Sequence, residues 1–437
     1  MASAGPALDD RVRDAAAKTT AAGGDESFMV IDVAEACDKV AAWRDLLPRV
    51  EPFYAVKCHD DDRIIQAFVQ LGIGFDCASK NEIQKALRLG AAPDRIVYAN
   101  PCKPLSHIRF AEASDVRLMT FDNHDELRKI ADVFPDAQLL LRLLPDDSDA
   151  QCRLGQKYGA ELEVVPSLLQ FAMDLGLNVV GMAFHVGSGC ARVSAYSDAV
   201  LLARQAFDIA EQLGMSLSVL DIGGGFPGDG ISTWAGRDPQ DMIFPNVARE
   251  LNLALDKHFS ASSGVRIIAE PGRYMVHSSC TLFVNIIARR LGPPNDRGTT
   301  DNIRYYVSDG VYGSFNNTLY DHATVAGYPL LPSSRAEEDG TNSGDQVRRG
   351  SLSRKASGSS ESSGPESTTL EEQTELEAFE SSVWGPTCDG LDCILPKVDL
   401  PLLQVGDWMY FPDMGAYTLA AAAAFNGFDV PGKVHVC

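Results

Sequence analysis

Between residues 52 and 270 the sequence alternates between short apolar segments, rich in β-branched or aromatic residues, and longer amphipathic segments. Continuous apolar strands joined by helices are typical of a parallel sheet, because helices cover both of its faces. The predicted strands are 52–56, 72–76, 95–99, 116–122, 138–143, 178–185, 216–222 and 265–270. Eight strands in about 220 residues favour a closed (β/α)8, TIM-like barrel. A doubly wound open sheet remains the alternative on this pattern alone.

The pattern changes after residue 276, where β segments follow one another without regular helices. Examples are "CTLFVNIIARR", "NIRYYVSDG", "VGDWMYF" and "GKVHVC". They predict a second, mostly antiparallel β domain, which the earlier strand "FMVIDV" (28–33) could join. The predicted organisation is a disordered segment over 1–25, the first β-domain strand and a connection over 26–40, the barrel over 41–275 and the β domain over 276–437.

A low-complexity segment over 333–379 interrupts the β domain. Eleven serines fall between residues 333 and 367, with almost no large apolar side chain. Such a segment buries too little apolar surface to offset the entropy lost on ordering. We therefore predict a disordered insert.

Composition excludes several classes of function. The chain has 437 residues, 45% of them hydrophobic, and a formal net charge of −22. This acidity argues against a surface for nucleic acid or anionic membranes, and it suits a small cationic substrate. The first 25 residues lack the apolar segment of a signal peptide, and the sequence has no apolar run of 18 residues. We expect a cytoplasmic protein that does not span a membrane.

The cysteines do not follow a metal-binding or disulfide pattern. Ten are scattered along the chain without a C-x-x-C pair, as expected in a reducing compartment. Cys388 and Cys393 lie five positions apart, but a zinc site would need a second close pair of ligands. We predict no metal. A disulfide, or a thiol placed for chemistry beside Asp389, remains open for this segment.

Chemically capable groups end six of the predicted barrel strands. They are Lys57, Asp76, Arg142, His185, the glycines at 223–225 and Glu270. A single charge at a strand end is usually a solvated loop residue. Functional residues of such barrels, however, come from the carboxyl ends of several strands, so six together predict a site.

Two glycine-rich segments predict an anion site on the same rim. "DIGGGFPG" (221–228) offers backbone N–H groups that an anion can approach closely, and "HVGSG" (185–189) adds Ser188 as a hydroxyl donor. The first segment lacks the G-x-G-x-x-G spacing, so a dinucleotide is less favoured. A lysine, a carboxylate and a phosphate cradle on one rim match pyridoxal 5′-phosphate. The lysine would form a Schiff base, and the carboxylate would keep the pyridine nitrogen protonated.

Seven motifs, read together, resemble eukaryotic ornithine decarboxylase from about residue 28 to residue 430, without the insert. They are "PFYAVKC", "GFDCASK", "FHVGSGC", "DIGGGFPG", "EPGRY", "WGPTCDG" and "MGAYT". This family has an alanine-racemase-like barrel, a β domain and pyridoxal phosphate. The resemblance implies that Lys57 forms the Schiff base, that His185 stacks on the cofactor ring and that Glu270 faces the pyridine nitrogen. The other implied cofactor-binding residues are Asp76, Glu82, Arg142, Ser188, Gly224, Gly225, Gly272, Arg273 and Tyr417.

The same resemblance implies a substrate site shared between the subunits of a head-to-tail homodimer. Tyr320, Asp321 and Asp389 would bind substrate, and Cys388 would act in catalysis. In the family, the residues matching Cys388 and Asp389 reach the cofactor of the other subunit. Residues matching Lys157 and Asp392 form a salt bridge across that interface, beside a tight segment that contains Gly415. Cys393 is interpreted as ordinary packing.

The implied reaction is decarboxylation of L-ornithine to putrescine and CO2, a step of polyamine biosynthesis. Decarboxylation leaves a carbanion at Cα, and a poised thiol can return the proton. Two aspartates suit a terminal ammonium and repel a distal carboxylate. Lysine or another basic amino acid is the alternative substrate, because lysine is only one methylene longer. A catalytically inactive protein resembling antizyme inhibitors is the alternative outside enzymes, and an antizyme-like regulator is a possible partner.

Overall fold

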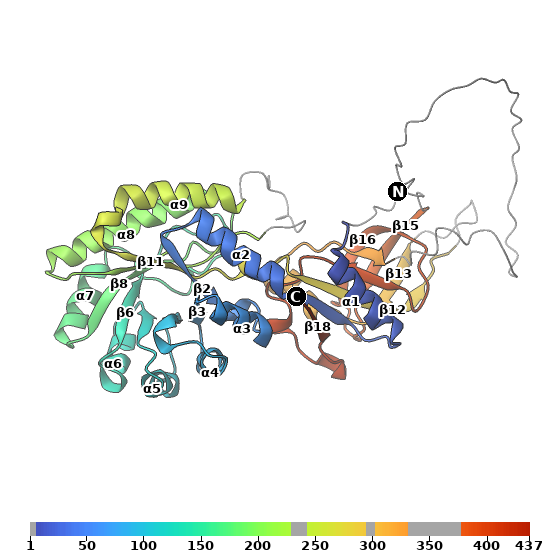
Figure 1. Cartoon of the computed structure of the whole chain (residues 1–437), viewed down its shortest axis with the longest axis horizontal. Coiled ribbons are helices and arrows are strands. Elements are labelled where there is room, and N and C mark those ends of the chain that lie inside the picture. Colours follow the sequence, from blue (N-terminus) through green and yellow to red (C-terminus); the bar gives the residue numbers. More distant parts are fainter. Residues whose placement is uncertain (1–5, 229–242, 294–301, 331–376) are drawn as a thin grey trace, which may run out of the picture.

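A closed barrel forms the larger part of the molecule. The computed structural model describes residues 6–228, 243–293, 302–330 and 377–437. Within them, eight parallel strands close in the order β10-β11-β2-β3-β4-β5-β6-β8 (Figure 1). They are β2 (Val50–Ala55), β3 (Gly74–Cys77), β4 (Ile96–Tyr98), β5 (Leu118–Phe121), β6 (Gln138–Arg142), β8 (Asn178–Ala183), β10 (Val219–Asp221) and β11 (Arg266–Ala269). Each overlaps its predicted strand. The barrel is confirmed and the open sheet is wrong, because β11 pairs with β2 and leaves no edge.

Helices surround the barrel on the outside (Figure 1). They are α2 (Val33–Leu46), α3 (Asp62–Gln70), α4 (Lys80–Arg88), α5 (Leu105–Ala113), α6 (His124–Val133), α7 (Val165–Asp174), α8 (Ser194–Gln212) and α9 (Phe244–His258). Side-chain caps define several starts: Ser79 accepts from the Glu82 N–H and Asn123 from the Glu126 N–H. The boundary predicted between residues 40 and 41 falls inside α2.

Side chains fill the barrel interior. Seven strands contribute to one buried apolar cluster, which consists of Phe53, Val97, Leu118, Leu140, Ala183, Val219 and Ile268. The eighth strand, β3, provides space there through Gly74, where a Cβ would lie 2.4 Å from the Phe53 ring. Because the interior is packed, only the ends of the barrel can hold a site.

The β domain is one mixed sheet. Its strands follow the order β14-β17-β12-β13-β15-β16, and β1 pairs with β12 and β18 off this path. They are β1 (Phe28–Asp32), β12 (Cys280–Arg290), β13 (Ile303–Val307), β14 (Tyr328–Leu330), β15 (Ala378–Trp384), β16 (Cys393–Pro401), β17 (Trp408–Phe411) and β18 (Gly432–Val436). All pairs are antiparallel except β13–β15 and β1–β18. The mostly antiparallel domain, joined by the strand before the barrel, is confirmed.

Two local predictions need correction. Disorder over 1–25 is wrong for residues 10–21, which form helix α1 (Asp10–Ala21). Asp9 caps this helix, and Val12 and Ala16 pack in an apolar cluster with Phe28 of the sheet. The predicted insert lies outside the described residues over 333–376, whereas Ala378 and Phe379 already belong to β15.

Short elements shape the site. The unpredicted pair β7 (Ala150–Cys152) and β9 (Ser188–Cys190) is antiparallel and holds Ser188 beside the barrel rim. Helices α10 (Arg273–Val276) and α11 (Asn317–Tyr320) present Arg273 and Tyr320. No helix in the described ranges is long and apolar enough to cross a membrane.

Candidate active site

A small pocket gathers most of the predicted cofactor-binding residues at the carboxyl ends of the barrel strands. Lys57 lies in a turn directly after β2, His185 follows β8, and Glu270 follows β11. Tyr417 reaches the same pocket from the β domain. The lining residues are Ala55, Lys57, His185, Ser188, Gly225, Phe226, Glu270, Gly272, Arg273 and Tyr417. The fold therefore brings Lys57 and Tyr417 together, although they lie at opposite ends of the sequence.

Lys57 is held by the carboxylate of Asp76. Its Nζ donates to an oxygen of that side chain, which is fully buried in β3. Burial opposes the charge of Lys57, but the carboxylates of Asp76 and Glu270 hold the pKa of the amine above its usual value. Burial raises the pKa of Asp76, and the ammonium partly offsets this. In the cofactor-free protein Lys57 is thus a paired cation, which must lose a proton before it can act as a nucleophile.

Glu82 and Arg142 lie around this pair and do not line the pocket. The Glu82 carboxylate accepts a hydrogen bond from the Ala78 N–H, and burial raises its pKa. Arg142 ends β6, with its guanidinium 5.3 Å from the centre of the Tyr158 ring. Its positive charge lowers the pKa of Asp76. Both residues therefore interact electrostatically with the Lys57–Asp76 pair.

Glu270 and Asp221 form a buried acidic pair, of which sequence reasoning named only Glu270 as a site residue. Burial, followed by the charges of Asp221 and Asp76, raises the pKa of Glu270 well above its usual value. Burial also raises the pKa of Asp221 to about 7, against a hydrogen bond from the Gly223 N–H. Both acids therefore keep their protons to a higher pH than ordinary carboxyl groups do. The sequence did offer a signal for Asp221, because this carboxylate lies at the end of a predicted strand, just before the glycines.

His185 is neutral and has a defined tautomer. Burial, together with the cations Arg142 and Lys57, lowers its pKa well below the usual value. Its Nδ1 accepts from the Gly187 N–H at 3.0 Å, so the proton of the neutral ring is on Nε2. A flat, uncharged ring at the pocket wall is suited to stacking against an aromatic ligand.

The glycines make a bare cradle. At Gly224 a Cβ would lie 2.8 Å from Nε2 of His185, and at Gly225, whose φ is +94°, it would lie 2.4 Å from the Gly187 carbonyl oxygen. The buried hydroxyl of Tyr196 has no hydrogen-bond partner among the described residues, and it lies 3.4 Å from the Cβ position of Gly225. Sequence reasoning missed Tyr196, because a tyrosine on an amphipathic helix is indistinguishable from core packing.

Arg273 completes the cradle and contacts two other predicted residues. Its Nη2 donates to Ser188 Oγ at 3.3 Å and to both carboxylate oxygens of Asp321, at 2.7 and 2.6 Å. Its guanidinium lies 5.2 Å from the centre of the Tyr417 ring. Tyr320, next to Asp321, is 72% exposed. Arg273, predicted to bind phosphate, is therefore paired directly with Asp321, predicted to bind substrate.

Cys388 and Asp389 do not line the pocket of their own chain. Cys388 is exposed, and its N–H donates to Asn426 Oδ1 at 3.0 Å. The Asp389 carboxylate accepts from the Tyr312 hydroxyl, a hydrogen bond that lowers the pKa of Asp389. Both residues therefore have hydrogen-bond partners in the β domain and lie outside the pocket of their own barrel.

The three predicted interface residues differ in their surroundings. Lys157 Nζ lies 4.9 Å from the centre of the Tyr158 ring. Asp392 is buried and accepts from the N–H groups of Val311 and Thr387 and from the Thr387 hydroxyl. At Gly415 a Cβ would lie 1.6 Å from the Val276 carbonyl oxygen, so the backbones approach there too closely for any side chain.

Comparison with known proteins identifies the family. Residues 33–277 match the family model described as pyridoxal-dependent decarboxylase, pyridoxal binding domain. The chain belongs to this family. It is 44% identical to ornithine decarboxylase of Rattus norvegicus over 94% of this chain and 80% of the relative. It is 43% identical to ornithine decarboxylase of Neurospora crassa, over 99% of this chain and 85% of that relative. It is also 41% identical to antizyme inhibitor 2 of Xenopus laevis, over 92% and 79%.

Solved structures share the whole two-domain fold. Arginine decarboxylase of Paramecium bursaria Chlorella virus superposes with a TM-score of 0.81 at 29% identity, covering 98% of this chain and all of that one. Lysine decarboxylase of Selenomonas ruminantium, solved with pyridoxal phosphate and cadaverine, superposes with a TM-score of 0.77 at 28% identity, covering 98% of this chain and 94% of that one. Relatives of this pyridoxal-dependent family therefore act on more than one basic amino acid.

The residues present fit pyridoxal phosphate. The backbone at Gly224 and Gly225 packs too closely on His185 and Gly187 for any side chain, which leaves its N–H groups uncovered by a Cβ, and Arg273 and Ser188 lie at the same pocket as phosphate donors. One oxygen of Asp76 and one of Asp221 are buried without a hydrogen-bond partner among the described residues. Buried polar atoms without partners are uncommon. Neither aspartate lines the pocket itself, but each contacts a residue that does, Asp76 through Lys57 and Asp221 through Glu270.

Proposed function

We propose that this protein decarboxylates L-ornithine to putrescine and CO2 with pyridoxal phosphate. The observation that carries the proposal is the pocket itself, where Lys57, neutral His185 and the buried carboxyl of Glu270 surround a glycine cradle. Relatives that are 43 and 44% identical over nearly the whole chain and are named ornithine decarboxylase support this substrate.

Each residue of the chain has a separate task in this proposal. When bound, pyridoxal phosphate supplies an aldehyde carbon for the amino group and a ring that withdraws electrons from Cα. Lys57 would hold the cofactor covalently between turnovers. The protons kept on Glu270 and Asp221 by burial can be shared with a ring nitrogen placed against Glu270. His185 would pack its neutral face against the ring.

The cofactor phosphate and the terminal ammonium of the substrate would be held by different groups. Arg273, Ser188 and the N–H of Gly225 would hold the cofactor phosphate, and Asp321, beside Arg273, would lie near the substrate side chain. Asp389 and Asp321 suit a terminal ammonium because both are acids. The Cys388 thiol would return a proton to Cα after CO2 leaves.

We also propose a homodimer in which Cys388 and Asp389 complete the site of the other subunit. Their absence from the pocket lining of their own chain supports this arrangement. Lys157, Asp392 and Gly415 would lie at or beside the interface. Because one relative is named antizyme inhibitor 2, an antizyme-like regulator is a candidate partner.

The test is turnover with a panel of basic amino acids. Purified protein with pyridoxal phosphate is given ornithine, lysine, arginine or diaminopimelate, and CO2 release is followed at several concentrations. We expect the highest kcat/KM for ornithine. The two solved decarboxylases named for arginine and lysine make those substrates the alternative. A protein that binds the cofactor yet releases no CO2 from any of them would instead support a binding role like that of an antizyme inhibitor.

A further inference from the structure

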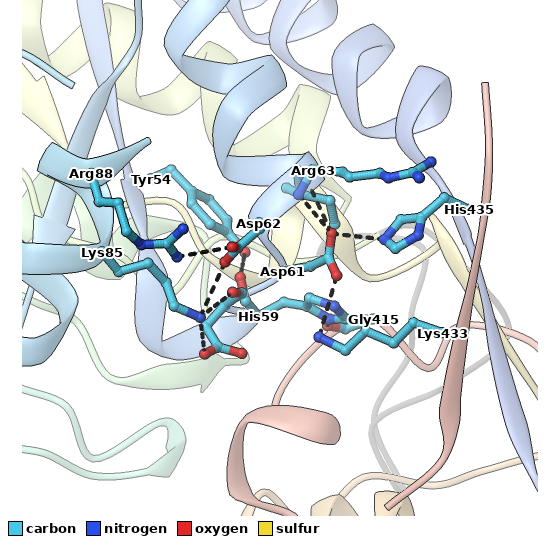
Figure 2. A network of polar contacts seen from close by, with 12 residues as sticks. Tyr54, His59, Asp61, Asp62, Arg63, Lys85, Arg88, Gly415, Lys433 and His435 are labelled. Atoms are coloured by element: carbon cyan, nitrogen blue, oxygen red, sulfur yellow. Dashed lines mark hydrogen bonds and ion pairs between the residues drawn. The ribbon is translucent and has the colours of Figure 1, made fainter. Parts of the chain in front are cut away.

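Asp61 joins the turn that carries Lys57 to the edge of the β domain. It caps helix α3, accepting from the N–H groups of Arg63 at 2.9 Å and Ile64 at 3.4 Å. The same carboxylate accepts from Lys433 Nζ at 3.2 Å and pairs with His435 Nε2 at 3.0 Å, both on β18 (Figure 2). Its side chain is only 4% exposed. One buried carboxylate thus contacts barrel backbone and β-domain side chains at once.

The turn is held to the β domain at a second place. The Tyr417 N–H donates to the Cys58 carbonyl at 2.9 Å. The Gly415 carbonyl oxygen lies 2.8 Å from His59 Nδ1, and the His59 carbonyl accepts from the Tyr54 hydroxyl at 2.8 Å (Figure 2). Cys58, His59 and Asp61, which follow Lys57 in the sequence, are therefore each held by at least one hydrogen bond to the β domain.

Electrostatics favour the charged form of Asp61. Burial raises the pKa of its carboxyl, but the charges of Lys433 and His435 outweigh burial and lower that pKa below its usual value. A buried carboxylate that loses its cationic partners becomes costly to keep in place. Movement of β18 and movement of the Lys57 turn are thereby linked.

We infer that β18 acts as a clasp that positions Lys57 through Asp61, which makes Asp61, Lys433 and His435 positioning residues for the cofactor lysine. The inference rests on the proposed role of Lys57. A rigid turn presents the Lys57 amine to the cofactor in one geometry, and a loosened turn would retain the cofactor less well.

The neighbouring carboxylates provide a matched control. Asp60 pairs with Lys85. Asp62 pairs with Lys85 and with Arg88, the latter at 2.8 Å (Figure 2). All these partners belong to α4 of the barrel, and both aspartates are about half exposed. Asp62→Asn therefore removes the same charge from the same end of α3 without touching the β domain.

The experiment compares cofactor retention in Asp61→Asn and Asp62→Asn. Asparagine can still cap α3, but its amide N–H would face the donors of β18. Protein loaded with pyridoxal phosphate is freed of excess cofactor, and the decay of its visible absorption band gives the release rate. We expect release about tenfold faster in Asp61→Asn and unchanged in Asp62→Asn. Equal rates in the two variants would overturn the inference, even if Asp61→Asn melts at a lower temperature.

Variants on β18 keep the test decisive if Asp61→Asn does not fold. His435→Gln preserves a donor and should retain the cofactor as wild type does, whereas His435→Ala should release it faster. Lys433→Met should also speed release, and where Asp61→Asn does fold, Lys433→Met should add little in that background, because both substitutions break the same contact. Additive effects would contradict the clasp. Because retention is measured without turnover, a wild type that holds cofactor but decarboxylates nothing refutes only the proposed function.

Discussion

The two halves of the candidate site differ in how completely one chain builds them. The half around Lys57 is enclosed by barrel strand ends and Tyr417, and burial together with neighbouring charges shifts the pKa values of Lys57, His185 and Glu270. The half with Cys388 and Asp389 lies in a β-domain turn and outside that pocket. In the proposed dimer the first half would hold the cofactor within one chain, whereas the second would act at the site of the other subunit.

Removal of Lys57 tests the enclosed half and has the largest expected effect. Lys57→Ala should lower kcat by about a thousandfold or more, because it removes both the covalent hold on the cofactor and a proton-transfer group. Borohydride treatment followed by peptide mapping should label a Lys57 peptide in wild type and nothing in the variant. Label on another lysine would contradict the assignment.

Mixing two inactive variants tests whether the two halves come from different chains. Lys57→Ala and Cys388→Ala dimers should each be nearly inactive. After free subunit exchange, half of all dimers are mixed, and each mixed dimer has one intact site of two. Activity should then recover to about a quarter of wild type, as two-fold symmetry requires. No recovery despite proven exchange would show that each chain builds its own site.

Asp389→Ala sharpens the distinction between cofactor binding and substrate binding. It should raise the KM for ornithine by about tenfold or more, because it removes a partner of the terminal ammonium, and it should leave cofactor retention unchanged. Tyr312→Phe is the matched control, since it removes only the hydroxyl that donates to Asp389. Its KM should rise less. A loss of cofactor with an unchanged KM would exclude the substrate role.

The smallest expected effect concerns the buried acids of the enclosed half. The folded-state pKa of Asp221, about 7, lies above its usual value of 3.8. The folded protein thus binds more protons than the unfolded chain between these values, so this group's contribution to stability falls as pH rises toward 7. The measurement is the free energy of unfolding in urea, without cofactor. Between about pH 5 and pH 7 it should fall by roughly 1–2 kcal/mol less in Asp221→Asn than in wild type. An identical pH dependence would refute the shift.

Local pattern was sufficient for the barrel. All eight predicted strands overlap observed ones, because a continuous apolar run between amphipathic helices has few alternative structures. The same reasoning failed at α1, where a polar, alanine-rich segment was interpreted as disordered. This helix packs in an apolar cluster with Phe28, Phe283 and Tyr410, two of which are distant in the sequence, and such packing stabilises a short helix that propensity alone would not.

The sequence by itself determined the barrel, the β domain and the residue types of a pyridoxal phosphate site, since these follow from periodicity and from motifs at strand ends. Only the tertiary structure decided which groups share protons, which residue pairs with Arg273 and how β18 reaches the Lys57 turn. Tyr196 and Asp61 are ordinary residues in the sequence. They acquire their roles through burial and through neighbours distant along the chain, which local sequence does not encode.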